Sequence, residues 1–139
     1  MALDLRARTL EVNEQTYAAW NAHDPYAVAA VFAEDAVLRE AGRPEEIRGR
    51  AAIRARAAAL LGAFPDFRLE RIVLVVDGDR HADRWVMTGT HRGALFGIPP
   101  TGRAVRIEGA TFTRLGAQGL VVEDVHHVDY AGLMAQLGL

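Results

Sequence analysis

The stretch FRLERIVLVVDGDRHADRWVMTGTH, residues 67–91, does most to predict the fold of this 139-residue chain. Apolar and polar residues alternate on both sides of DGD (77–79), which is typical of two strands joined by a tight turn. Two further strand-like segments follow at residues 103–115 and 120–129, with the turn GAQG between them. Four consecutive strands joined mostly by tight turns indicate an antiparallel meander.

The residues before the meander have the spacing of helices. One face of a first helix, over residues 3–21, is outlined by bulky and small apolar residues: Leu10, Tyr17, Trp20, Ala7 and Ala18. Asp24 followed by Pro25 predicts the N-cap of a short second helix through Phe32. Residues 36–41 are a candidate strand, and 42–49 are expected to form a polar loop. A third helix, at residues 50–64, ends before Pro65, and a short helix at 130–138 closes the chain.

This order of elements predicts one α+β domain over residues 1–139, in which three N-terminal helices cover one face of a curved antiparallel sheet. A strongly curved sheet closed by helices tends to form a cone, and a cone encloses a pocket where a ligand is expected. The large aromatic residues expected to line that space, or to pack the core around it, are Tyr17, Trp20, Phe32, Phe64 and Trp85.

Composition narrows the function. The chain is 50% hydrophobic and 24% charged with a net charge of −2, which argues against nucleic acid and membrane surfaces as partners. It has no cysteine, no serine and no lysine, which excludes thiolate, serine and lysine Schiff-base chemistry. The charges in MALDLRARTLEV (1–12) interrupt the apolar run that a signal peptide needs, so we expect a cytoplasmic protein.

Two adjacent histidines in VEDVHHVD (122–129) are candidate catalytic groups or metal ligands. Alternation along a strand puts His126 on one face with Asp124, and His127 on the other face with Glu123 and Asp129. The two rings cannot then serve one ion, so no metal is expected. One histidine should be solvated, and the other, on the concave face, suits a general acid or base near neutral pH.

The other histidines have simpler interpretations. His91 shares a strand face with Trp85, and it could orient a substrate carbonyl or fix the loop that follows. His23 and His81 are expected to face solvent. The loop GALFGIPPTGR (93–103) is too apolar to be freely solvated, and composition alone does not decide between a docked lid and an interface element.

Several segments together resemble the SnoaL-like polyketide cyclase family, which belongs to the nuclear-transport-factor-two superfamily of cone-shaped α+β barrels. The segments are AWNAHD (19–24), GRAAIRA (49–55), GTHRGALFGIPPTGR (89–103), GATFTR (109–114), VED (122–124) and DYAGLMAQLG (129–138). The resemblance covers nearly the whole chain, and its most specific parts are the PPTGR loop and the D-x-x-G tail.

The resemblance implies ring closure of an aromatic polyketide by intramolecular aldol condensation, without metal or organic cofactor. In the family's cyclases the acid/base group is an aspartate three positions before the aspartate of the tail. The tail aspartate here is Asp129, so the matching position is His126. The family's polar pocket positions on the preceding strand fall near Gly109 and Thr111.

We therefore hypothesise a cofactor-independent enzyme for a hydrophobic, carbonyl-bearing small molecule. His126 would be the general acid/base, His91 or Thr111 would polarise an oxygen, and Asp129 would orient a neighbour or anchor the tail helix. One alternative is a non-catalytic binding or accessory domain. Another is an isomerase or hydrolase, although Arg84 and Asp83 alternate across strand faces and do not form an inward acid–arginine cluster. The sheet face left open would favour a homodimer.

Overall fold

The computed structural model describes residues 3–139. Its helices and strands follow in the order α1 (Leu5–Asn21), α2 (Pro25–Ala30), β1 (Phe32–Glu40), β2 (Glu46–Arg48), α3 (Arg50–Ala63), β3 (Arg68–Asp77), β4 (Arg80–Thr90), β5 (Ala104–Leu115), β6 (Val121–Val128) and α4 (Tyr130–Gln136).

The strands form one sheet in the order β2-β1-β6-β5-β4-β3. The predicted meander is confirmed, because β3, β4, β5 and β6 pair in sequence and antiparallel. β1 is longer than predicted and pairs parallel to β6, with Leu38 opposite Asp124. The predicted polar loop contains β2, which pairs with β1. Both pairings depend on contacts between different segments, so the local sequence pattern of either segment does not predict them.

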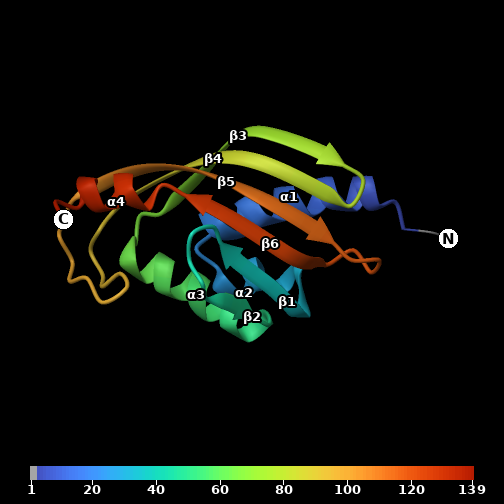
Figure 1. Ribbon diagram of the computed structural model, residues 1–139, viewed down its shortest axis with the longest axis horizontal. Helices are drawn as coiled ribbons and strands as arrows, with labels where there is room; N and C mark the ends of the chain where they lie inside the picture. Colours follow the sequence, from blue (N-terminus) through green and yellow to red (C-terminus); the bar gives the residue numbers. More distant parts are fainter. Residues whose placement is uncertain (1–2) are drawn as a thin grey trace.

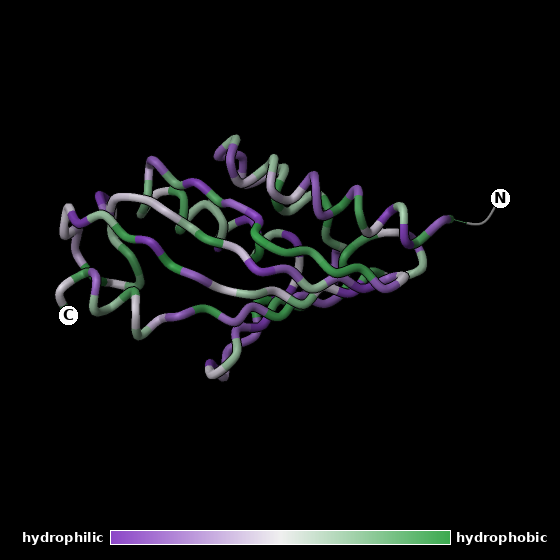
Figure 2. The backbone as a smooth tube through the Cα atoms, turned by 90° about the horizontal axis from the view of Figure 1, so that it is seen from above, coloured by the Kyte–Doolittle hydropathy of each residue, from purple (hydrophilic) through white to green (hydrophobic). Residues whose placement is uncertain are grey.

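The sheet and the helices form two layers around a common interior. The long strands β3–β6 make a curved layer, α2 and α3 lie on its concave side, and α1 packs against β3 and β4 (Figure 1). Hydrophobic and hydrophilic positions alternate along the tube of the strands (Figure 2), as expected when one strand face meets the interior. No helix within residues 3–139 has the length and apolar character needed to cross a membrane.

The inner face of α1 differs from the predicted one. Ala7 and Ala18 are exposed, whereas Thr9 and Asn13 are buried. Both polar side chains have hydrogen-bond partners: the Thr9 hydroxyl lies 2.6 Å from the Leu5 carbonyl and 2.8 Å from the Gly78 carbonyl in the β3–β4 turn, and the Asn13 amide donates to Asp83 on β4. A hydrogen-bonded polar side chain can be buried at little cost in free energy. The spacing of apolar residues alone therefore predicted the wrong inner face for α1. The predicted Asp24 cap of α2 is confirmed, because its side chain accepts the Ala27 N–H.

Candidate active site

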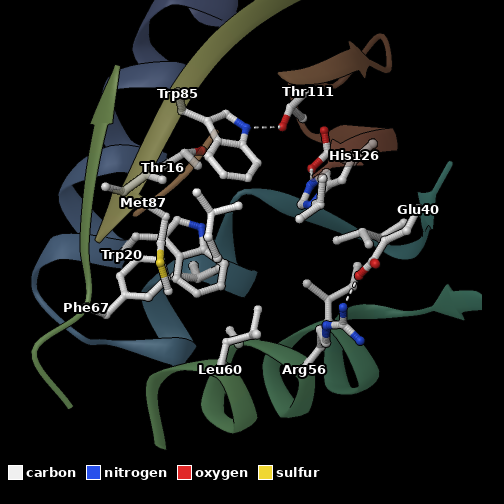
Figure 3. Close-up of a pocket in the computed structure, with 18 of the residues that line it drawn as sticks. Thr16, Trp20, Glu40, Arg56, Leu60, Phe67, Trp85, Met87, Thr111 and His126 are labelled. Atoms are coloured by element: carbon white, nitrogen blue, oxygen red, sulfur yellow. Dashed lines mark hydrogen bonds and ion pairs between the residues drawn. The ribbon is translucent and has the colours of Figure 1, made fainter. Parts of the chain in front are cut away.

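A cavity of about 140 Å³ lies between the concave face of the sheet and the helices. Figure 3 shows Trp20, Phe67 and Met87 on one side and His126, Glu40 and Arg56 on the other, so the cavity has an apolar side and a polar side. All six residues predicted to contact a substrate line it: Tyr17, Trp20, Phe32, Phe64, Trp85 and Thr111.

His126 and His127 lie on opposite faces of β6, as strand alternation predicts. His126 lines the cavity, while His127 is exposed and packs edge-on against Phe112 on the outer face. The His126 Nε2 atom lies 2.8 Å from Oδ2 of Asp124, whose Oδ1 accepts the Thr113 hydroxyl. Asp124 is buried, so it fixes the ring orientation and favours the proton on Nε2. The Nδ1 atom of His126 then remains to exchange a proton with a ligand.

Thr111 stands directly opposite His126 across β5 and β6. Its Oγ1 accepts the indole N–H of Trp85 at 2.9 Å, a bond marked in Figure 3. Because the oxygen accepts this bond, the Thr111 hydroxyl proton is available to a bound oxygen. The indole occupies the space beside Gly109, where an added Cβ would lie 2.3 Å from ring atoms of Trp85. In this part of β5, therefore, Thr111 supplies the hydroxyl group that faces the cavity.

A cluster of polar side chains that the sequence did not identify holds Asp83 on β4. Its Oδ2 accepts the Tyr17 hydroxyl at 2.7 Å and the Asn13 amide at 3.0 Å. Arg71 donates to Asn13 Oδ1 at 2.7 Å from the far side. Burial, and next the bond to Asp83, raise the pKa of Tyr17 well above its usual range. Tyr17 therefore stays protonated near neutral pH and donates its hydroxyl proton to Asp83.

A second unexpected cluster lies where β1, α3 and α4 meet. Arg56 forms an ion pair with Glu40 Oε1, and the Tyr130 hydroxyl donates to Glu40 Oε2. The sequence predicted no inward acid–arginine pair from Arg84 and Asp83, because neighbouring residues on a strand point to opposite faces. Glu40 and Arg56 supply one from elements far apart in sequence, and both line the cavity. Both Glu40 oxygens are already engaged.

His91 lies outside the residues that line the cavity. It is completely buried against Phe64, and its Nδ1 accepts the backbone N–H of Thr101 at 3.2 Å. The backbone bonds from Gly102 N–H to the His91 carbonyl and from His91 N–H to the Arg103 carbonyl close the same loop. Of the two roles considered for His91, the geometry supports fixing the loop, because the ring does not reach the cavity wall.

The loop over residues 93–103 docks on its own chain. Leu95 is 3% exposed and lines the cavity, which matches the docked-lid alternative. Phe96 also lines the cavity and lies beside Arg43, Arg56 and Tyr130.

Asp129 also lies outside the cavity lining, on the outer side of the sheet. Its side chain accepts the Gly132 N–H at 2.8 Å and caps α4, so it anchors the tail helix, one of the two roles expected for it. A Cβ at Gly132 would lie 2.2 Å from the Asp129 carboxylate. The D-x-x-G pattern is therefore a capping device that requires glycine at its last position.

The prediction for His81 was wrong. His81 is 7% exposed and lines the cavity, because residues 81, 83 and 85 share the inner face of β4. Burial lowers the pKa of His81 below its ordinary value, although the charges of Asp83 and Asp124 act in the opposite direction. His23 is exposed, as predicted. Within residues 3–139, no three His, Asp or Glu side chains are arranged to hold a metal ion.

Known proteins resemble this chain in sequence and in structure. A family model described as SnoaL-like polyketide cyclase matches residues 10–137. AclR from Streptomyces galilaeus, a proposed hydroxylase, shares 28% identity at a TM-score of 0.83, over 96% of this chain and 82% of that chain. IdmH from Streptomyces antibioticus, a proposed polyketide cyclase, shares 29% identity at a TM-score of 0.76, over 94% and 99%.

A protein of ketosteroid isomerase-like fold from Catenulispora acidiphila shares 21% identity at a TM-score of 0.78, over 94% of this chain and 95% of that one. At this identity the similarity shows the fold alone, and it confirms the predicted cone-shaped α+β class. A comparison with functionally curated proteins gave no match.

Proposed function

The chain belongs to the SnoaL-like polyketide cyclase family, and we propose that it is a cofactor-independent enzyme that closes a ring in a hydrophobic, carbonyl-bearing small molecule by intramolecular aldol condensation. The observation that carries the proposal is the pairing of His126 with buried Asp124 in the wall of a largely apolar cavity. Such a pair is a general base whose tautomer is fixed by its carboxylate.

The reaction needs no group beyond these side chains. Nδ1 of His126 takes a proton from a carbon flanked by carbonyls, and the resulting enolate carbon attacks a ketone carbon of the same molecule. A C–C bond forms, the electron pair of the C=O bond moves to oxygen, and the imidazolium returns the proton to that oxygen. The product is an isomer of the substrate.

Thr111 supports this reaction as a donor to the enolate oxygen. Its oxygen is held by Trp85, and its cross-strand position opposite His126 sets donor and base side by side. A fixed donor in a water-poor cavity stabilises developing negative charge more than water does. His91 and Asp129 have no step in this proposal, because both are occupied in holding the loop and α4.

Proton transfer can be tested without knowing the substrate. In D₂O, the protein should accelerate deuterium exchange at the acidic carbon of an aryl β-ketoester such as ethyl benzoylacetate, followed by NMR. His126→Asn and Asp124→Asn should each reduce the acceleration by roughly 100-fold or more, the usual contribution of a general base. His127→Asn makes the same change one residue away on the outer face and should leave it unaltered.

Exchange at the wild-type rate in His126→Asn would overturn the assignment of the base. Cyclisation itself is then tested with aromatic β-ketoesters that carry a second ketone, followed by product mass and NMR. If these compounds bind but neither exchange nor product is accelerated by the wild type, the non-catalytic binding domain is the better description.

Hydrolysis in the same cavity is a second candidate, because Glu40 and Arg56 form an inward acid–arginine pair. Both oxygens of Glu40 are engaged by Arg56 and Tyr130, so this carboxylate is a poor base for activating water. Ester or epoxide substrates in H₂¹⁸O distinguish the two reactions, since hydrolysis incorporates ¹⁸O and aldol closure does not.

A homodimer is the proposed state of association. Apolar side chains cross the outer face of four strands in one row, with Val75 opposite Ala82, Ala82 opposite Phe112 and Phe112 opposite Val125. Val75 and Phe112 are 61% and 54% exposed. An apolar row with two largely exposed side chains is a feature of protein interfaces, and a second copy of the same face can cover it.

A further inference from the structure

Two buried polar side chains on β4 have capacity for hydrogen bonds that the described residues do not use. His81 and Asp83 are 7% and 6% exposed, and both line the cavity. Neither Nδ1 of His81 nor Oδ1 of Asp83 has a partner within residues 3–139. Nearly all buried polar atoms in folded proteins are bonded, so two such atoms on one strand face need an explanation.

Asp83 is held rigidly on one side only. Tyr17 and Asn13 both donate to Oδ2, and Arg71 supplies positive charge behind Asn13. These bonds come from α1 and β3 and leave Oδ1 as the carboxylate oxygen without a donor. A carboxylate oxygen can only accept, so the group that satisfies it must carry an O–H or N–H.

His81 complements this acceptor. Burial disfavours its charged form and lowers its pKa, so the ring is neutral at physiological pH and presents one N–H and one acceptor. Its cross-strand neighbour Thr113 already donates to Asp124. His81 and Asp83 are two positions apart on the same face of β4, so with the proton on Nδ1 the imidazole can donate to the same group that donates to Asp83. A hydroxyl satisfies both requirements with a single atom.

We propose that His81 and Asp83 form a hydroxyl-recognition subsite, and that the cavity accepts aromatic carbonyl compounds bearing a phenolic hydroxyl. The choice of carbonyl compounds rests on the proposed function, whereas the hydroxyl preference rests on β4 alone. Asp83, Thr111 and His126 stand in one cross-strand row, so the subsite and the base are two strand spacings apart, about 10 Å between backbones.

The subsite can be tested by binding alone, with 2-naphthol and 2-methoxynaphthalene as a matched pair and calorimetry as the measurement. The wild type should bind 2-naphthol at least tenfold more tightly, because the methoxy compound has no proton for Asp83. In Asp83→Asn the amide oxygen keeps the bonds from Tyr17 and Asn13, and its NH₂ group replaces Oδ1. A donor then faces the ligand, so the preference should reverse in favour of 2-methoxynaphthalene.

Glu40→Gln is the matched control, since it makes the same acid-to-amide change at the other end of the row. It should leave the ratio of the two affinities unaltered. His81→Phe keeps the ring and removes its N–H, which the oxygen of either compound can accept, so it should weaken 2-naphthol roughly tenfold and 2-methoxynaphthalene as well. This second variant tests the subsite even if Asp83→Asn does not fold.

Equal binding of the two naphthalenes by the wild type would overturn the proposal. So would an unaltered ratio in folded Asp83→Asn, an unaltered affinity for 2-naphthol in folded His81→Phe, or a ratio lost in Glu40→Gln instead. None of these measurements depends on turnover. If His126→Asn loses proton exchange but still prefers 2-naphthol, both proposals are supported. If the wild type prefers 2-naphthol but does not accelerate exchange, the subsite is supported and the proposed reaction is not.

Discussion

Gly109 shows how one residue shapes the cavity. It pairs with Trp85 across β4 and β5, and the indole ring occupies the space that a side chain would fill. Gly109→Ala should displace the ring, break its bond to Thr111 and lower the free energy of unfolding by about 1–3 kcal/mol, as overpacking commonly does. Urea denaturation and tryptophan fluorescence of the folded protein measure the two effects.

Gly62→Ala is the matched control for this prediction. Gly62 lies in α3, and an added Cβ there would meet nothing within 4 Å. Alanine should therefore stabilise the protein by about 0.5–1 kcal/mol through its higher helix propensity. Equal effects of the two substitutions would contradict the packing explanation.

His81 should make stability depend on pH. The ordinary pKa of a histidine side chain is 6.5, and the pKa of His81 is lower in the folded protein, where burial disfavours the charge. Between these two values the unfolded chain binds more protons than the folded one, so stability falls as the pH drops below about 6.5 and is unaffected above it. His81→Gln should therefore flatten the decline in the free energy of unfolding between about pH 6.5 and 5. A decline as steep as that of the wild type would assign it to other groups.

At the residue scale, the sequence predicted the cavity residues that are large and apolar better than those that are polar. Aromatic residues at helical or strand spacing face the interior for a simple reason, the removal of apolar surface from water. Asp83 and Glu40 face inward only because Asn13, Tyr17, Arg56 and Tyr130 meet them there. Those partners are 16 to 90 positions away, so no local pattern reveals them.

The loop from His91 to Arg103 forms part of the cavity wall through Leu95 and Phe96. The base of the loop is closed by the hydrogen bond from the Thr101 N–H to His91 Nδ1, and the Leu95 side chain lines the cavity. His91→Asn places an oxygen near the position of Nδ1 and should keep the loop closed, with proton exchange within a few-fold of the wild type. His91→Leu removes the acceptor and should expose residues 91–103 to hydrogen–deuterium exchange.

A catalytic His91 would give a different result. Both variants would then lose activity, and His91→Leu would do so without faster hydrogen exchange in the loop. The comparison therefore decides between the two roles that the sequence left open.

Elements with a strong local signal were predicted to within two or three residues. The four long strands alternate regularly, α2 begins at the Asp24 cap, and α3 ends before Pro65. β2 was missed because a three-residue edge strand has too short a pattern, and its pairing with β1 decides its conformation. The start of β1 at Phe32 was missed for the same reason, since its partner β6 is about 90 residues away.

At the scale of the whole molecule, the curved sheet separates a polar row and an apolar row of side chains by face. The concave face carries the row Asp83, Thr111, His126 and Glu40, and the convex face carries the row Val75, Ala82, Phe112 and Val125. Because strand alternation creates both rows from the same sheet, a substitution on one face should leave the chemistry of the other unaltered.

The convex row supplies the test of association. Phe112→Arg introduces a charge at the exposed centre of the row and should weaken self-association by about 30-fold or more, the effect of losing an aromatic hot spot. Sedimentation velocity at micromolar concentration should then show the 15.2 kDa monomer, whereas the wild type should sediment as a dimer. Tyr26→Arg makes the same kind of change on α2, at a side chain that is 69% exposed, and should leave the dimer intact. A wild type that sediments only as monomer would contradict the homodimer, and a dimer retained in Phe112→Arg would move the interface to another face.

The monomeric Phe112→Arg variant also tests whether each cavity needs a partner. We expect proton exchange at the wild-type rate per chain, because all the residues that line the cavity come from one chain.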